Sequence, residues 1–230
     1  MATATLGGTH APLIQPRLDE LARVFINAFP LMNADEQRLA LILYHRLAEG
    51  EPVAVADLAR TLDQSVESVQ TVLESWPGVF FDDDHRIQGF WGLTVMPMHH
   101  QFKVDGRTVY TWCAWDALFI PELLNRAAEV TSRCGTTGES IRMTITPDGI
   151  KTSTHKGVMV SFLTPDEDEL EKNITASFCH FVYLFRDRSA GEQWVAEHEG
   201  TFLLPIEDAF TVGKKMNAIR YKQTLTTLGS

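Results

Sequence analysis

The chain has 230 residues, of which 44% are apolar, enough for a sizeable core in one or two domains. Its 20 basic and 30 acidic residues give a formal net charge of −10. This charge argues against a general binder of nucleic acid or anionic membranes, because such binding comes from basic patches. No apolar run reaches the roughly 18 residues of a membrane span, and the N-terminus lacks the basic region of a signal peptide. We therefore expect a cytoplasmic protein with no membrane partner.

The first third of the chain has the pattern of a helix-turn-helix followed by a β-hairpin wing. Residues 1–14 are predicted to form a loosely held arm. Helices are predicted over residues 18–29, from a cap at Asn33 or Asp35 to Gly50, and over 53–62 and 65–74. Strands over 79–81 and 86–90 would form the wing, with three aspartates between them.

The charge of this motif bears on whether it binds DNA. A recognition helix over residues 65–74 would have to enter the major groove. It carries Glu67 and Glu74 and neither Lys nor Arg, and the wing tip adds Asp82, Asp83 and Asp84. Such a surface repels phosphate, so we interpret the motif as a scaffold and expect no nucleic-acid partner.

After Leu93 the chain takes on the alternation of β-structure. A hairpin is predicted around Asp105–Gly106. Further strands are predicted over 128–131, 140–145 and 157–163, an exposed acidic segment over 164–172, and helices over 189–198, with a capping box at its start, and 205–221. The most apolar segment, residues 176–185, is predicted to be a central strand with Cys179 near its middle.

These patterns together predict an α+β fold. We expect an N-terminal arm and winged-helix-like helical domain over residues 1–94. A mixed or antiparallel β-sheet core with flanking helices should follow over residues 95–230.

The stretch from Tyr110 to Pro121 places a thiol three residues before a carboxylate, within an apolar and aromatic run. If the stretch is helical, Cys113 and Asp116 share one face. With Thr111 as N-cap, Cys113 would lie in the first turn, where backbone N–H groups favour the thiolate. Pro121 is expected to kink or break this helix.

Three cysteines occur, at positions 113, 134 and 179, and none forms a C-x-x-C pair. This spacing excludes zinc-ribbon and thioredoxin motifs. Thiolates select soft metal ions. A soft ion with two or three ligands would be satisfied by Cys113, Cys179 and Asp116, and Asp116 could also carry a proton. The surrounding aromatic residues would accept an organic group.

Three segments resemble organomercurial lyase, the alkylmercury lyase of bacterial mercury resistance. They are Tyr110–Asp116 with Pro121, Val130–Cys134 with Thr137–Gly138, and Ser177–Cys179. The resemblance extends along most of the chain and includes the winged-helix-like region. Some members have a second cysteine where His180 stands here.

The resemblance implies protonolysis of a carbon–mercury bond, with a hydrocarbon and Hg(II) as products. Cys113 and Cys179 would capture the mercury, Asp116 would shuttle the proton, and Cys134 would be structural. Mercury would be substrate and product, so no cofactor is implied. Cytosolic small thiols would be needed for turnover, and a mercuric reductase could accept the Hg(II). The protein would act as a monomer or a homodimer.

Two alternatives stay open at this point. The protein could be a non-catalytic, thiol-based metal- or redox-sensing winged-helix regulator, or its cysteines could be purely structural. Strand alternation would place His180 opposite Cys179, as a packed core residue rather than a ligand.

Overall fold

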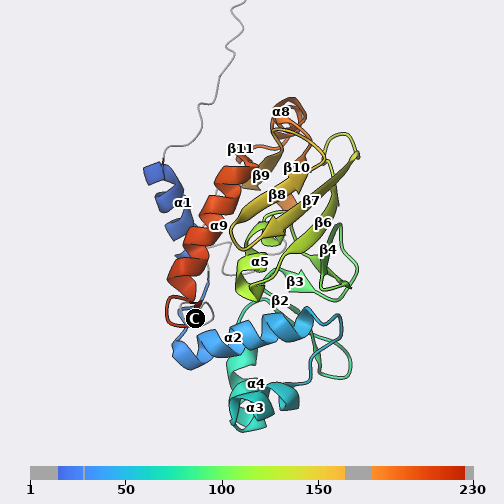
Figure 1. The fold of residues 1–230 in the computed structure, drawn as a ribbon. Helices are drawn as coiled ribbons and strands as arrows, with labels where there is room; N and C mark the ends of the chain where they lie inside the picture. Colours follow the sequence, from blue (N-terminus) through green and yellow to red (C-terminus); the bar gives the residue numbers. More distant parts are fainter. Residues whose placement is uncertain (1–14, 28, 164–177, 226–230) are drawn as a thin grey trace, which may run out of the picture.

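The protein is described by a computed structural model that covers residues 15–27, 29–163 and 178–225 (Figure 1). The helices are α1 (Gln15–Asn27), α2 (Ala34–Leu47), α3 (Val55–Leu62), α4 (Val66–Ser75), α5 (Asp116–Leu124), the 3-10 helix η1 (Cys179–Phe181), α8 (Arg188–Val195) and α9 (Ile206–Arg220). The strands are β1 (Val79–Phe81), β2 (Ile87–Phe90), β3 (Leu93–Thr94), β4 (His100–Val104), β5 (Arg107–Thr111), β6 (Ala128–Arg133), β7 (Ser140–Thr146), β8 (Gly149–Ser153), β9 (Met159–Leu163), β10 (Leu184–Phe185) and β11 (Thr201–Pro205). The predicted acidic segment 164–172 and the arm 1–14 lie outside the described residues.

The N-terminal helices form because their caps are encoded locally. Asn33 and Glu36 make a reciprocal capping box at the start of α2, with bonds of 2.7 and 3.0 Å. The Ser65 hydroxyl accepts the Ser68 N–H at 3.1 Å and caps α4. The α3–α4 pair and the β1–β2 hairpin reproduce the predicted helix-turn-helix and wing.

An antiparallel sheet of eight strands, in the order β1-β2-β3-β5-β4-β6-β7-β8, runs through the molecule. Gly89 of β2 pairs with Thr94 of β3, and Thr94 pairs in turn with Tyr110 of β5. The wing and the core strands therefore belong to one sheet, which continues across residue 94. The α+β class with an antiparallel core is confirmed.

Helix α9 runs along the sheet and holds α5 in place, with α1 on its outer side (Figure 1). The Trp115 indole N–H donates to the Ala209 carbonyl at 2.9 Å. The Asn217 amide donates to the Phe119 carbonyl at 3.1 Å. These buried bonds fix the start of α5, from which one part of the candidate site projects.

Residues 178–185, the described part of the segment 176–185, do not form a central strand, so the prediction was wrong for them. Residues Cys179–Phe181 form η1, and only Leu184–Phe185 form a strand, at the edge of a second sheet ordered β10-β9-β11. The Ser161 hydroxyl donates to the Phe181 carbonyl at 2.7 Å and accepts the Tyr183 N–H at 3.0 Å. The Ser161 side chain thus makes hydrogen bonds that the backbone of a paired strand would otherwise make. An apolar run in the sequence does not by itself distinguish a buried strand from a buried irregular segment.

Other local predictions also need correction. Of the kink or break predicted at Pro121, the break does not occur. Helix α5 continues to Leu124, because Leu118, Ile120 and Leu123 are fully buried and their packing outweighs the proline's cost of about 3 kcal/mol. Helix α8 is capped by Asp187, whose carboxylate accepts the Ala190 N–H at 2.9 Å, and not by a capping box at Ser189. Strands β8 and β11 were not predicted.

Within the part of the chain that the structure describes, no helix has the length and apolarity needed to cross a membrane.

Because α9 packs closely on α5, we expect a glycine-to-alanine change in α9 to lower the stability of the protein instead of raising it. A methyl group at Gly213 would lie 2.7 Å from the Phe119 Cβ. A glycine-to-alanine change within a helix normally stabilises by about 1 kcal/mol. Here Gly213→Ala should destabilise by about 1–2 kcal/mol through overpacking, lowering Tm by about 2–8 °C in a thermal melt.

The control for this prediction is the exposed α9 residue Ala218. Ala218→Gly should destabilise by about 1 kcal/mol, the ordinary helix-propensity effect. A stabilised Gly213→Ala variant would contradict the close α5–α9 contact.

Candidate active site

Cys113 lies in the bend between β5 and α5, three residues before the helix begins at Asp116. Thr111 remains in β5, and its hydroxyl donates to the Cys113 carbonyl at 2.9 Å. The prediction that Cys113 lies in the first turn of a helix was therefore wrong. Instead the Asp116 carboxylate reaches back and accepts the Cys113 backbone N–H at 2.9 Å. This bond, and not a shared helix face, holds the thiol and the carboxylate together.

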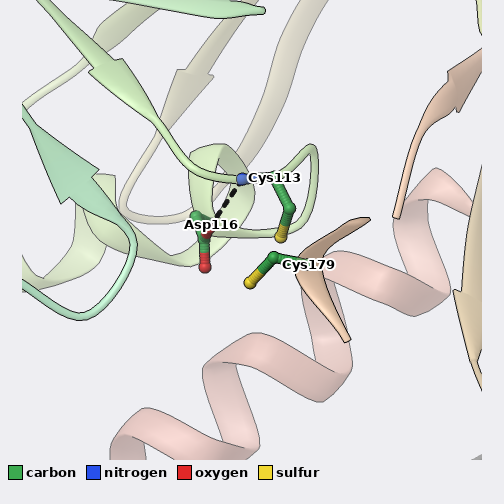
Figure 2. Close-up of side chains that lie close together, drawn as sticks. All are labelled: Cys113, Asp116 and Cys179. Atoms are coloured by element: carbon green, nitrogen blue, oxygen red, sulfur yellow. Dashed lines mark hydrogen bonds between the residues drawn. The ribbon is translucent and has the colours of Figure 1, made fainter. Parts of the chain in front are cut away.

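Cys179, on η1, comes from a distant part of the chain and meets this bend (Figure 2). One carboxylate oxygen of Asp116 and the sulfurs of Cys113 and Cys179 all lie within 4.8 Å of one another. Figure 2 shows both thiols and the carboxylate directed toward a common point. The structure therefore brings together the three residues that the sequence singled out.

The site is buried among aromatic side chains. The exposed fractions of Cys113, Asp116 and Cys179 are 1%, 6% and 8%. Phe25 of α1 packs against Trp115 and Phe178, with ring centroids 4.7 and 5.0 Å apart. Trp115 and Phe178 are themselves buried and stand next to Asp116 and Cys179 in the sequence, so the surroundings of the site are apolar and suit an organic group. Phe25 was missed at the sequence level, where α1 showed only an amphipathic pattern.

Burial sets the protonation states of the three groups. It raises the pKa of Asp116 to about 6, although hydrogen bonds from the Cys113 side chain and backbone act to lower it. Burial also raises the pKa of Cys113 well above its ordinary value, reinforced by the hydrogen bond with Cys179 and the charge of Asp116. The expected thiolate stabilisation at Cys113 was wrong, because the thiol lies outside the helix and away from solvent.

The second thiol is affected in the same direction. The hydrogen bond with Cys113 lowers the pKa of Cys179, but burial and the charge of Asp116 outweigh it, and the pKa is raised. At neutral pH the site thus holds two protonated thiols beside an ionised carboxylate. That carboxylate is the group best placed to receive a thiol proton.

Cys134 and His180 lie apart from this cluster. Cys134 is buried, its backbone N–H donates to the Glu139 carbonyl at 2.8 Å, and it forms a bridge with Leu184. These contacts fit a packing role. His180 is exposed and its ring meets the edge of Phe181, so the predicted burial of His180 was wrong.

Two thiols and a carboxylate that converge in a buried, aromatic-lined cluster are the donor set of a protein that handles a soft metal and moves a proton beside it. This donor set lies on an α+β scaffold that also carries a helix-turn-helix. The chain belongs to the alkylmercury lyase family, whose family profile matches residues 93–217. A second profile, the helix-turn-helix domain of alkylmercury lyase, matches residues 31–91.

Relatives named alkylmercury lyase match most of the chain. The one from Staphylococcus epidermidis is 39% identical over 188 residues, which are 82% of this chain and 85% of the relative. The one from Pseudomonas putida is 41% identical over 175 residues, 76% of this chain and 81% of the relative. The crystal structure of the mercury-bound form of MerB2 shares the fold, with a TM-score of 0.70 and 22% identity over 91% of this chain and 99% of that one.

Proposed function

We propose that this protein cleaves the carbon–mercury bond of alkyl- and arylmercury compounds by protonolysis. Cys113 and Cys179 are the capturing thiols, and Asp116 is the proton carrier. The observation that carries the proposal is the convergence of the two sulfurs and the carboxylate oxygen within 4.8 Å. Membership of the alkylmercury lyase family supports the same reaction.

The first step is capture of the organomercury cation. One thiol bonds to mercury through sulfur and displaces the ligand that mercury carried in solution, and the thiol proton leaves with that ligand. In the second step the other thiol gives its proton to Asp116, and the resulting thiolate adds to the same mercury. The 4.8 Å limit on all three ligand atoms allows both sulfurs to reach one ion.

Bond cleavage follows from this arrangement. Two sulfur donors raise the electron density on the carbon bonded to mercury, so that carbon is easier to protonate. Asp116 then delivers its proton to the carbon, and the electron pair of the carbon–mercury bond forms the new carbon–hydrogen bond. The hydrocarbon departs, Hg(II) remains on the two sulfurs, and the carboxylate is regenerated without any oxidation or reduction.

Turnover requires removal of the bound Hg(II). We propose that cytosolic small thiols, or a mercuric reductase, accept the ion by thiol exchange at Cys113 and Cys179. The direct test of the function is to incubate the protein with phenylmercury and excess small thiol. Benzene in the headspace is measured by gas chromatography. Benzene release faster than in a protein-free control supports the proposal, and release no faster than in that control contradicts it.

The helix-turn-helix is proposed to serve as a scaffold and not as a DNA-binding element. Glu67 and Glu74 of α4 are exposed, and α4 contains neither Lys nor Arg. Phosphate contacts by basic side chains dominate DNA affinity, so this helix has the wrong charge for the major groove.

The raised pKa of Asp116 predicts how activity depends on pH. Asp116 must be ionised to accept a thiol proton, and its pKa in the free enzyme is raised to about 6. As pH falls through about 6, the carboxyl becomes protonated, and kcat/KM for phenylmercury should fall about tenfold per pH unit below this value. An unshifted carboxyl would place this limb near pH 4. A rate that is flat from pH 5 to 7 would contradict Asp116 as the acceptor.

A further inference from the structure

The turn between β2 and β3 has a backbone that is unfavourable for ordinary residues. Trp91 has a φ angle of 34° and Gly92 one of 99°. Left-handed backbone is rare for a bulky side chain and persists only where the surrounding structure enforces it. The conformation of this turn therefore needs an explanation beyond joining two short strands.

Several distant elements hold this turn in place. The Tyr44 hydroxyl of α2 donates to the Trp91 carbonyl at 2.7 Å, and the Trp91 indole N–H donates to the Pro77 carbonyl at 2.6 Å. The Arg220 guanidinium, at the end of α9, stacks over the Trp91 ring with its carbon 4.3 Å from the ring centroid. Tyr44 and Trp91 are both almost completely buried. The turn is thus anchored on several sides.

With the turn anchored in this way, the backbone of Gly92 lies against the Asp116 carboxyl. A Cβ atom at residue 92 would lie 2.5 Å from both Cγ and Oδ1 of Asp116, closer than any van der Waals contact permits. The Gly92 carbonyl also accepts the Trp112 N–H at 2.9 Å, next to Cys113. The carboxyl is therefore held between the Cys113 N–H at Oδ2 and the Gly92 backbone on the Oδ1 side.

We propose that the Trp91–Gly92 turn, anchored by Tyr44, is the positioning element that fixes the Asp116 carboxyl beside the two thiols. The inference deepens the proposed function and rests on Asp116 as the proton carrier. Gly92 and Tyr44 act through Asp116 and are positioning residues. The helical N-terminal region thereby gains a role in the reaction, because it supplies both Tyr44 and the turn.

The first test is Gly92→Ala, assayed by benzene release from phenylmercury. A displaced carboxyl is a misplacement of about 1 Å, which costs about 100-fold in rate. We expect kcat to fall by about that factor with KM changed less than about threefold, because both capturing thiols remain. The matched control is Gly50→Ala. Gly50 has a similar φ of 91°, yet no atom lies closer than 4.0 Å to a Cβ built there, so this variant should keep its kcat.

A second test measures the contact without substrate. The fall in Tm caused by Gly92→Ala is compared in the wild-type, Asp116→Asn and Asp116→Ala backgrounds. Asparagine has the shape of aspartate and keeps the whole clash, whereas alanine removes the two 2.5 Å contacts at Cγ and Oδ1 and leaves the contact with the Cβ of residue 116 at 2.9 Å. We expect the fall in the first two backgrounds to exceed the fall in the third by at least about 3 °C. Equal falls in all three would overturn the contact.

A third variant tests the anchor. Tyr44→Phe removes only the hydroxyl that holds the Trp91 carbonyl, and we expect kcat to fall about tenfold, the effect of about 1.4 kcal/mol, at nearly constant KM. It gives an answer even where Gly92→Ala does not fold.

The outcomes separate the two proposals. Absence of benzene from the wild type contradicts the lyase function, while the Tm comparison still reports the Gly92–Asp116 contact. An active wild type, with Gly92→Ala or Tyr44→Phe at wild-type kcat, overturns the positioning role.

Discussion

Cys179→Ser should lose nearly all hydrocarbon release, by at least about 1,000-fold, or about 4 kcal/mol of transition-state stabilisation. Mercury is a soft ion, and a hydroxyl oxygen cannot replace a thiolate as its ligand. With one sulfur gone, the carbon on mercury gains less electron density and resists protonation. Cys113→Ser should show the same loss, because the two sulfurs act on one ion within the 4.8 Å cluster. Benzene release from phenylmercury measures both.

Cys134→Ser is the matched control for these thiol variants. Cys134 is as buried as the other two cysteines, with 2% exposure, but it lies outside the cluster. Serine there should keep much of the activity and lose some stability, since a polar hydroxyl would replace the thiol in a buried position. Equal loss of activity in all three variants would indicate general damage to the fold and would contradict a two-thiol site.

Local sequence signals were enough for most of the fold. Asn33, one of the two caps predicted for α2, and Ser65, which precedes α4, mark the starts of these helices in the structure. Asp105–Gly106 predicted the β4–β5 turn, where both residues have positive φ angles as a type I′ turn requires. Such signals involve neighbours in sequence, so they survive without knowledge of the tertiary structure.

Tertiary contacts decided the predictions that failed. The stretch from Thr111 to Trp115 is apolar enough for a helix, but pairing of Thr111 with Leu93 and His100 keeps Thr111 in the sheet, and residues 112–115 form a bend and turn before α5. In the segment around Cys179, Ser161 replaces ladder bonds with its side chain, and no local pattern announces this. The wrong secondary structure still left the site residues identifiable, because thiols and a carboxylate are few and chemically distinctive.

The supports of the site could not be predicted in the same way. Phe25 reads as one apolar position of an amphipathic helix, and Gly92 as a turn glycine. Their roles depend on the 4.7 Å approach of Phe25 to Trp115 and on the closeness of Gly92 to Asp116. Both contacts join segments that are far apart in sequence. Phenylalanine and glycine are not catalytic or metal-binding residue types, so nothing in the sequence marks these two positions as part of a site.

Asp116→Asn should reduce hydrocarbon release by about 100- to 10,000-fold, the usual contribution of a positioned acid–base group. The amide oxygen can still accept the Cys113 N–H, so the bend should keep its shape. The amide cannot receive a thiol proton or deliver one to carbon. Capture by the first thiol should therefore proceed while cleavage stops, and benzene release by gas chromatography measures the cleavage.

The same variant should accumulate the intermediate that the wild type consumes. Mass spectrometry of the native protein should show the mass of the phenylmercury group retained on Asp116→Asn, and Hg(II) alone on the wild type. The charge of Asp116 raises the pKa of both Cys113 and Cys179, so its removal should also lower both thiol pKa values, measurable by thiolate absorbance. If the thiols of this variant are more reactive and the carbon–mercury bond is still not cleaved, proton delivery and metal capture are separate steps. Rapid benzene release by Asp116→Asn would assign the proton to another group.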